Sequence, residues 1–354
     1  MSRFMSACYR ALEEYVPGEQ PQDRVYIKLN TNESPYPPSP KTLDALSREA
    51  AEQLCLYSDP ESRALKEGLA SLYGVGYENV FVSNGSDDIL NFAFMAFGKD
   101  SGVTFPDITY GFYRVFAELH GIDARICLLS EDFSVSVDDY LRTGRMVVIA
   151  NPNAPTGMAL PISEIERIVR NNPDNVVLVD EAYVDFGAES AVSLIGKYDN
   201  LLVVQTYSKS RSMAGARLGF AFASEGIIRD LEKIKYSTNP YNVNRLTQAA
   251  GLAALSEDEY YKNNCKKIMK TREETKKALE EMGFAVLPSS ANFLFAKHPD
   301  ISGESIYRAL KEKGILIRHF SAQRIKDYNR ITVGTPTQMG ALLDALKNIL
   351  KGTD

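Results

Sequence analysis

The chain has 354 residues, and its 44% hydrophobic and 10% aromatic content is ordinary for a globular protein large enough for two domains. Its net charge of −6 leaves no dominant basic face, so we expect no nucleic-acid partner and no binding to an anionic membrane. No apolar run approaches the roughly 20 residues of a transmembrane helix, and the first residues lack the apolar core of a signal peptide.

The four cysteines are scattered along the chain without the CxxC spacing of a zinc site or a redox pair. The three histidines are also far apart, so the sequence indicates no metal site. These features predict a cytoplasmic protein with reduced thiols, whose cysteines are Cys8, Cys55, Cys127 and Cys265.

Residues 1–41 are expected to form an N-terminal arm. The stretch NTNESPYPPSP, residues 30–40, is rich in proline and favours an extended backbone. We therefore predict that the arm wraps the body of the protein and packs with the smaller of its two domains.

Residues 42–255 alternate short apolar runs with helical patterns. Most of these runs are apolar throughout, which is typical of strands that helices bury on both faces. We predict a large α/β domain with a mostly parallel seven-stranded sheet between helices. Between two strands, SEIERIVR predicts a helix that begins with a capping box of Ser163 and Glu166. The expected strands are residues 80–83, 102–105, 125–129, 146–150, 176–180, 201–205 and 218–223.

Residues 256–354 have the pattern of a small α+β domain. A long helical pattern begins at Ser256, with Glu259 completing a capping box, and stops at Gly283. The last helix is expected to begin after Thr335, with Pro336 at its first position. Between these helices lie the short apolar runs NFLFA, ILIR and RITV.

Two loops follow predicted strands, at the sheet edge where open α/β proteins bind ligands. In SNGSDD, residues 83–88, a glycine and a serine at a helix start can offer free backbone N–H groups to a phosphate. An equally good interpretation is that Asp87 and Asp88 only complement the helix dipole. In NPNAPTG, residues 151–157, two prolines form a rigid turn, with cis X–Pro bonds as one option, that holds the Asn153 amide in place.

Two further strand ends carry charged residues. Asp180 ends an expected buried strand, where it is either a local cap or salt-bridge partner, or the partner of a bound cation. Lys209 is either a solvated loop lysine or a reactive amine. Thr206, Ser208 and Arg217 surround it with the side-chain types that hold a phosphate dianion. A phosphate site, an acid and a lysine together point to pyridoxal 5′-phosphate (PLP) as cofactor.

The chain resembles the fold-type I, class II PLP-dependent aminotransferases, and among them the histidinol-phosphate aminotransferase family. The likeness covers nearly the whole chain, and the lysine motif is its most specific part. The motifs that carry it, in family order, are KLNTNESPYPPSP, YSDPESRALK, SNGSDD, FPDITYGFY, NPNAPTG, VDEAYVDF, TYSKSRSMAGARLGF and RITVGT.

The resemblance implies a role for each motif. Lys209 would hold PLP as an internal aldimine and then act as general acid and base. Asp180 would pair with the pyridine nitrogen, Asn153 and Tyr183 would hydrogen-bond the ring 3′-oxygen, and Tyr110 would stack on the ring. The other positions implied to bind the cofactor and its phosphate are Gly85, Ser86, Asp87, Thr206, Ser208 and Arg217.

The resemblance also implies a homodimer and a substrate site. Tyr57 matches a tyrosine that reaches the cofactor phosphate of the neighbouring subunit. Arg330 and Arg318 would bind the phosphate of one substrate and the carboxylate of the other. Tyr15 and Asn32 belong to the N-terminal stretch that lies over the site.

The activity that follows from the resemblance is a ping-pong transamination between L-histidinol phosphate and 2-oxoglutarate, which gives imidazole acetol phosphate and L-glutamate in histidine biosynthesis. Two other enzymes of the same fold remain open: an aromatic amino-acid aminotransferase and a threonine-phosphate decarboxylase. A PLP-binding regulator is a further alternative, against which the lack of a basic DNA-binding extension argues. A nucleotide-binding protein is excluded because neither GxxxxGK[ST] nor GxGxxG is present.

Overall fold

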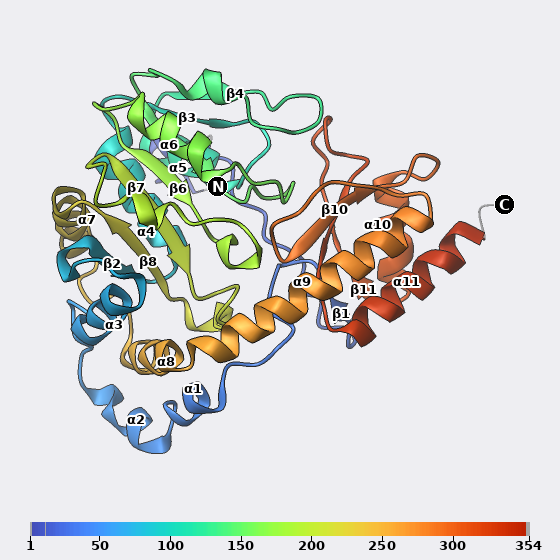
Figure 1. Ribbon diagram of the computed structural model, residues 1–354, viewed down its shortest axis with the longest axis horizontal. Helices are drawn as coiled ribbons and strands as arrows, with labels where there is room; N and C mark the ends of the chain where they lie inside the picture. The colour runs from blue at the N-terminus through green and yellow to red at the C-terminus, as the bar shows by residue number, and fades with distance from the viewer. Residues whose placement is uncertain (1, 11, 352–354) are drawn as a thin grey trace.

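The computed structural model describes residues 2–10 and 12–351. Figure 1 shows a larger body built around one sheet and a smaller body at the C-terminal end, with helix α9 (Asp258–Glu281) running between them. Within the described residues, no helix is long and apolar enough to cross a membrane.

The large sheet has seven strands in the order β2-β8-β7-β6-β5-β3-β4. Strand β8 is antiparallel to both of its neighbours, and all other pairs are parallel. The mostly parallel sheet is therefore confirmed, and each strand lies within one or two residues of its predicted position. The strands are β2 (Val80–Ser83), β3 (Val103–Pro106), β4 (Ala124–Cys127), β5 (Met146–Ala150), β6 (Val177–Asp180), β7 (Leu201–Thr206) and β8 (Gly219–Ala223).

The apolar runs form buried strands because both faces of the sheet are covered. Val177 and Val179 belong to the core on one face, and Leu178 belongs to the core on the other. Every residue of β5, β6 and β7 is buried, whereas the edge strand β4 is partly exposed. The first core contains α3 (Arg63–Tyr73), α6 (Ile162–Arg170) and α8 (Arg245–Ser256), and the second contains α4 (Ser86–Ala93), α5 (Phe112–His120) and α7 (Glu225–Thr238).

The smaller body is an antiparallel sheet in the order β12-β13-β10-β9, packed against two helices. Its strands are β9 (Ala285–Val286), β10 (Phe293–Lys297), β12 (Arg318–His319) and β13 (Asn329–Thr332). The helices are α10 (Gly303–Glu312) and α11 (Pro336–Lys351). Thr335 caps α11 as predicted, because the backbone N–H of Gln338 donates to its hydroxyl at 3.3 Å.

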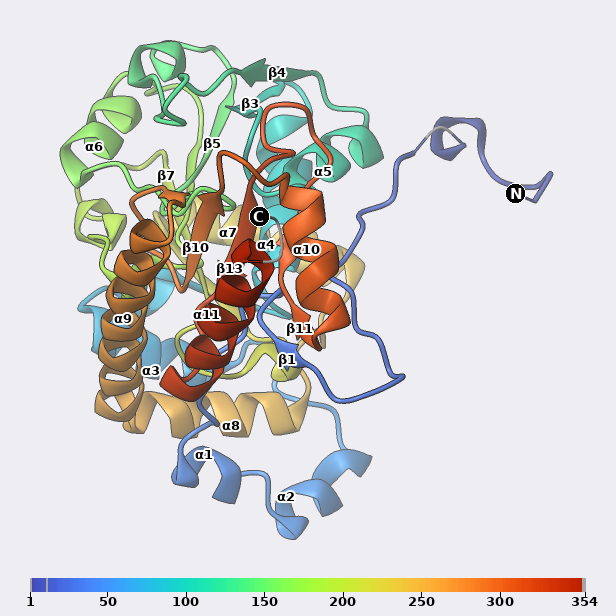
Figure 2. The same ribbon diagram turned by 90° about the vertical axis from the view of Figure 1, so that its right-hand side faces the viewer.

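The N-terminal arm joins this smaller body through a strand pair. Strand β1 (Ile27–Lys28) pairs in parallel with β11 (Ile315–Leu316), and Leu29 enters the core of the smaller body. Figure 2 shows the arm approaching from one side and meeting β11 near α10. After this pair the arm continues to the short helices α1 (Pro40–Asp44) and α2 (Arg48–Glu52) beside the large body.

Both predicted capping boxes are wrong. Helix α6 is preceded by Pro161 rather than capped by Ser163, so Ser163 lies inside its first turn. Ser256 is the last residue of α8, where its hydroxyl donates to the Ala253 carbonyl at 2.7 Å, and α9 begins two residues later. A serine that already bonds within its own helix is not available to cap the next one.

Candidate active site

The carboxyl ends of β5, β6 and β7 meet the start of α4 around a cavity of about 170 Å³, which we call the inner cavity. It brings together nine of the residues expected to act on the cofactor, although they come from segments more than 100 residues apart. These are Ser86, Asp87, Tyr110, Asp180, Tyr183, Thr206, Ser208, Lys209 and Arg217.

Lys209 lies in the turn after β7 and points its amine toward the arm. Its Nζ donates to the Thr31 carbonyl at 3.3 Å and lies 5.8 Å from the centre of the Tyr183 ring. Glu33, two residues further along the arm, also lines the inner cavity. Burial acts to raise the pKa of Glu33, but hydrogen bonds from Lys28 and Thr31 lower it overall, so this carboxylate stays charged beside the amine.

Asp180 ends β6 with only 4% of its surface exposed. Burial raises its pKa to about 6, while hydrogen bonds from the Tyr113 hydroxyl at 2.7 Å and the Ala182 N–H at 3.2 Å oppose that rise. A buried carboxylate in this state is stabilised by a cationic group placed next to it. Tyr113 was missed by the sequence analysis, although it is three residues after Tyr110 in the quoted FPDITYGFY motif. A turn at the start of α5, in which the Tyr113 N–H donates to the Tyr110 carbonyl at 3.2 Å, places both near the site.

Close backbone packing forms the floor of the inner cavity at the start of α4. Gly85 has φ +84°, and a Cβ there would lie 2.5 Å from Arg217 Nη2. A Cβ on Gly219 would lie 2.4 Å from the backbone nitrogen of Ser86. Both glycines are required by this close approach, which brings a helix N-terminus and a guanidinium together as a site for an anion.

Hydroxyl groups complete the anion site. The Thr206 hydroxyl donates to Ser208 Oγ at 3.0 Å and accepts the Ser208 backbone N–H at 3.1 Å. Asp87 holds Arg217 through an ion pair of 2.7 Å and accepts the Tyr110 hydroxyl at 2.8 Å. Asp87 therefore orients the guanidinium and the aromatic ring beside the anion site.

The structure does not bring the Asn153 amide into the inner cavity. Its Nδ2 donates to the Ile108 carbonyl at 2.9 Å and to Thr156 Oγ1 at 3.1 Å, which uses both amide hydrogens. The adjacent Ala154 lines the cavity instead. It lies in a loop that contains two cis X–Pro bonds, Asn151–Pro152 and Ala154–Pro155. Asn153 thus fixes the loop, and its side chain faces the polypeptide rather than the cavity.

A second, larger cavity of about 540 Å³ adjoins the first, and we call it the outer cavity. The two share Thr31, Tyr110, Ala154, Tyr183 and Lys209. The outer cavity also brings together the four residues expected to contact substrate, which are Tyr15, Asn32, Arg318 and Arg330.

Two of the arginines that line the outer cavity, Arg318 and Arg330, are held by the arm. Arg330 donates to the Asn30 carbonyl at 3.0 Å and lies over the Phe293 ring, and its buried Nε has no hydrogen-bond partner among the residues that the structure describes. Burial lowers the pKa of Arg330 from its usual value. Arg318 donates to the Val16 and Pro17 carbonyls at 2.9 and 3.0 Å. The arm therefore forms one wall of the outer cavity and positions both guanidinium groups.

Tyr57 lies outside both cavities, with 78% of its surface exposed. Its ring stacks on that of Tyr241 at a centroid distance of 4.5 Å. A large exposed aromatic pair on the surface is typical of a contact with another chain.

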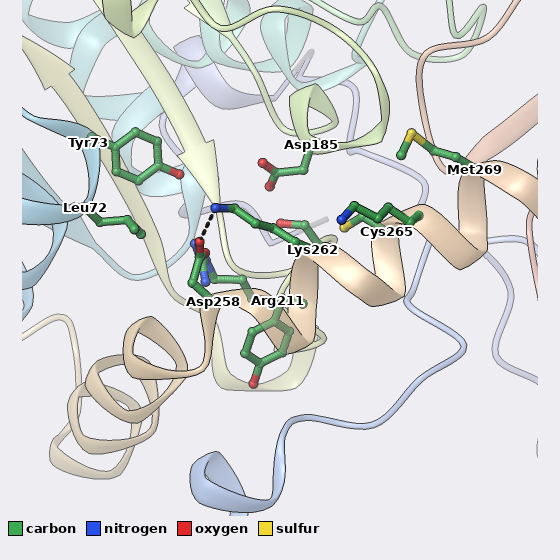
Figure 3. A pocket seen from close by; sticks show the side chains of 11 residues that line it. Leu72, Tyr73, Asp185, Arg211, Asp258, Lys262, Cys265 and Met269 are labelled. Atoms are coloured by element: carbon green, nitrogen blue, oxygen red, sulfur yellow. Dashed lines mark hydrogen bonds and ion pairs between the residues drawn. The ribbon is translucent and has the colours of Figure 1, made fainter.

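A third pocket of about 290 Å³ lies behind the Lys209 loop, between α3 and α9. Arg211 is 5% exposed and forms an ion pair of 2.7 Å with Asp258 at the start of α9. Figure 3 shows Asp258 between Arg211 and Lys262, with Tyr73 and Asp185 on the opposite side. The pair ties the loop that carries Lys209 to the helix that joins the two bodies.

A mostly parallel sheet that presents a lysine, a buried carboxylate and an anion site at one edge defines a class of group-transfer enzymes. The chain belongs to the family of class I and II aminotransferases, whose model matches residues 24–346.

Curated relatives are similar over almost the whole chain. A histidinol-phosphate aminotransferase of Marinomonas sp. is 51% identical over 99% of this chain and 100% of its own length. One from Brachyspira hyodysenteriae is 48% identical with the same coverage. Among solved structures, a putative histidinol-phosphate aminotransferase from Erwinia carotovora atroseptica superposes with a TM-score of 0.86 at 26% identity, covering 93% of this chain and 97% of that one.

Proposed function

We propose that the protein is a PLP-dependent aminotransferase that converts L-histidinol phosphate and 2-oxoglutarate into imidazole acetol phosphate and L-glutamate. The observation that carries this proposal is the meeting of Lys209, Asp180 and the anion site in one cavity, next to a second cavity whose lining includes Arg318 and Arg330. The names of relatives at 48% and 51% identity support the choice of substrate.

The residues of the inner cavity fit PLP. Arg217, Thr206, Ser208 and the start of α4 at Ser86 would hold the phosphate. Asp180 would keep a proton on the pyridine nitrogen, which accounts for a buried carboxylate whose hydrogen bonds come from the Tyr113 hydroxyl and the Ala182 N–H. When bound, PLP supplies an electron sink for the negative charge that develops at the substrate Cα.

Two other side chains would act on the cofactor ring. Tyr110 would pack against its face, since Asp87 holds the Tyr110 hydroxyl and fixes the plane of its ring. Tyr183 would donate to the 3′-oxygen. Asn153 is not part of this set, because both of its amide hydrogens bind protein oxygens.

Lys209 would carry the cofactor between turnovers and move the proton during them. Its Nζ would act as the base that takes the proton from the substrate Cα and as the acid that returns a proton in the reverse half-reaction. The amine donates to the Thr31 carbonyl at 3.3 Å, a long bond that it can exchange for another partner. Closure of the cavity by the arm would exclude water from this step.

The outer cavity would bind the remainder of each substrate. Arg330 and Arg318 would bind the phosphate of histidinol phosphate in one half-reaction and the carboxylate of glutamate in the other. Tyr15, which stacks on Phe112 at 4.2 Å, and the arm around Asn32 would form the wall against the substrate.

The assembly and organisation that we propose follow from the same features. The exposed Tyr57–Tyr241 pair would contact the second subunit of a homodimer, with Tyr57 reaching the phosphate of the neighbouring site. We propose residues 1–41 as the arm, 42–255 as the large domain and 256–354 as the small domain, in a cytoplasmic enzyme. The β1–β11 pair supports the grouping of arm and small domain.

The test is a spectral titration of the PLP-loaded enzyme with L-histidinol phosphate, phenylalanine, tyrosine and threonine phosphate, each added alone. We expect L-histidinol phosphate to convert the cofactor to its amine form at the lowest concentration. Conversion by phenylalanine or tyrosine but not by L-histidinol phosphate would favour an aromatic aminotransferase. Release of CO₂ from threonine phosphate would favour the decarboxylase.

A further inference from the structure

The hydroxyl of Tyr183 lies between a buried amide and the inner cavity. Asn32 Nδ2 donates to the Tyr183 oxygen at 2.8 Å. Because the amide nitrogen only donates, the Tyr183 oxygen is the acceptor in this bond and keeps its own hydrogen for another partner. Among the described residues, no other hydrogen bond involves this hydroxyl. The bond from Asn32 therefore holds the Tyr183 oxygen in place on the cavity wall, and the hydroxyl hydrogen is available to a ligand in the cavity.

Asn32 is itself held rigidly by the small sheet. It is 1% exposed and has φ +56°, a left-handed conformation that needs local support in a residue other than glycine. Its backbone N–H donates to Thr332 Oγ1 at 3.0 Å, and the Thr332 hydroxyl donates back to Asn32 Oδ1 at 2.9 Å. Asn292 Nδ2 donates to the Asn32 carbonyl at 3.0 Å.

This double contact with Thr332 fixes which end of the amide faces Tyr183. The carbonyl oxygen of the Asn32 side chain is turned to Thr332, so the NH₂ group is turned to Tyr183. Thr332 is on β13, two residues after Arg330. The strand that presents the substrate arginine therefore also sets the direction of the Tyr183 hydroxyl.

A second part of the cavity wall, formed by the loop after β5, offers no substitute for this donor among the described residues that line it. The loop after β5 contributes Pro152 and Ala154, neither of which has a side-chain donor. The amide next to Ala154, that of Asn153, binds Ile108 and Thr156 instead. Of the loops that follow β5 and β6, only the second, through Tyr183, would therefore offer a side-chain hydrogen bond to a ring oxygen bound between them.

We propose that Asn32 and Thr332 are positioning residues that orient the Tyr183 hydroxyl toward the 3′-oxygen of the cofactor, so that the small sheet governs how tightly the Lys209-linked cofactor holds its proton. The inference rests on the proposed cofactor and deepens it. It changes the role of Asn32, which the sequence assigned to substrate contact. A donor to the ring oxygen stabilises the deprotonated form of the linkage, so loss of its orientation makes the linkage hold its proton to higher pH.

The experiment is a pH titration of the absorbance of the PLP-loaded enzyme without substrate. We expect Tyr183→Phe to raise the titration midpoint by about one pH unit or more, as loss of one hydrogen bond to a charged group would do. Asn32→Ala and Thr332→Val should each raise the titration midpoint by roughly half of the Tyr183→Phe shift. Thr332→Ser keeps the hydroxyl and should leave the midpoint at its wild-type value. In the Tyr183→Phe background, Asn32→Ala should add no further shift, because its effect passes through that hydroxyl.

A matched control is Thr335→Val, which removes the cap of α11 but touches neither Asn32 nor Tyr183. It should lower the melting temperature and leave the midpoint unchanged. If Asn32→Ala does not fold, the Thr332→Val and Thr332→Ser pair decides the question. Unchanged midpoints in the Asn32 and Thr332 variants, or an Asn32→Ala shift that adds to that of Tyr183→Phe, would overturn the relay. A different result would overturn the cofactor assignment itself: wild-type enzyme whose absorbance does not depend on pH, or whose pH-dependent absorbance persists in Lys209→Ala. The positioning role of Asn32 and Thr332 would then fall with it.

Discussion

The inner and outer cavities meet at Lys209, but they draw their walls from different parts of the chain. The inner cavity is built at the ends of buried parallel strands, where short motifs place Asp180 and Lys209 directly after regular structure. The outer cavity is built from the arm, the start of α5 and the small sheet, and its Arg318 and Arg330 bind backbone carbonyls of the arm. The sheet edge thus supplies the chemistry, and the arm and small sheet supply the shape that selects a substrate.

The comparison predicts that residues anchoring the loops of the inner cavity contribute most to the free energy of unfolding. Arg211→Met should leave Asp258 without its buried partner and lower the free energy of unfolding by about 3 kcal/mol. The matched control is Lys262→Met, which removes the exposed partner of the same carboxylate and should cost less than about 1 kcal/mol. Denaturant unfolding of both variants measures the difference. Equal costs would show that the loop is not anchored through Arg211.

The outer wall should affect substrate binding more than turnover chemistry. Arg330→Ala removes a partly buried cation and should lower kcat/KM for L-histidinol phosphate roughly 100-fold. Arg318→Ala, which removes a more exposed group, should lower it roughly tenfold. Steady-state kinetics with both substrates checks this order. A larger loss for Arg318→Ala would reverse the roles that burial assigns to the two residues.

The smallest expected effect is the pH dependence of the cofactor-free protein. The pKa of Asp180 is raised to about 6 in the folded state, so its ionisation above that pH disfavours folding. Stability of the cofactor-free protein should therefore gain about 1 kcal/mol from this group as pH falls from about 7 to 5. Asp180→Asn should remove that gain. Unfolding curves of wild type and variant at both pH values give the difference, and parallel curves would contradict it.

The sheet could be predicted from sequence because its strands are buried on both faces and thus read as unbroken apolar runs. Two of the helix starts could not, since whether Ser163 or Ser256 caps a helix depends on the path of the preceding residues, whereas the cap at Thr335 was predicted correctly. Most of the inner cavity could also be predicted, because its side chains follow strand ends directly. Asn153 shows the limit, since a one-residue difference in a tight loop decides whether an amide or a methyl group faces the cavity.

Contacts made by backbone atoms could not be predicted from the sequence motifs. The Thr31 carbonyl binds Lys209, and the Asn30 carbonyl binds Arg330, yet any residue has such a carbonyl. The Asn32–Thr332 contact joins segments 300 residues apart and exists only because β13 and the arm lie side by side. These long-range pairs are features of the outer cavity, which is why its geometry needed the structure.

The central claim is that Lys209 carries the cofactor, and reductive labelling tests it most directly. Borohydride treatment of the PLP-loaded enzyme, followed by digestion and mass spectrometry, should place a phosphopyridoxyl group on the peptide that contains Lys209, and Lys209→Ala should lose the label. A label on another lysine, or an unlabelled peptide in an enzyme that still turns over, would contradict the account.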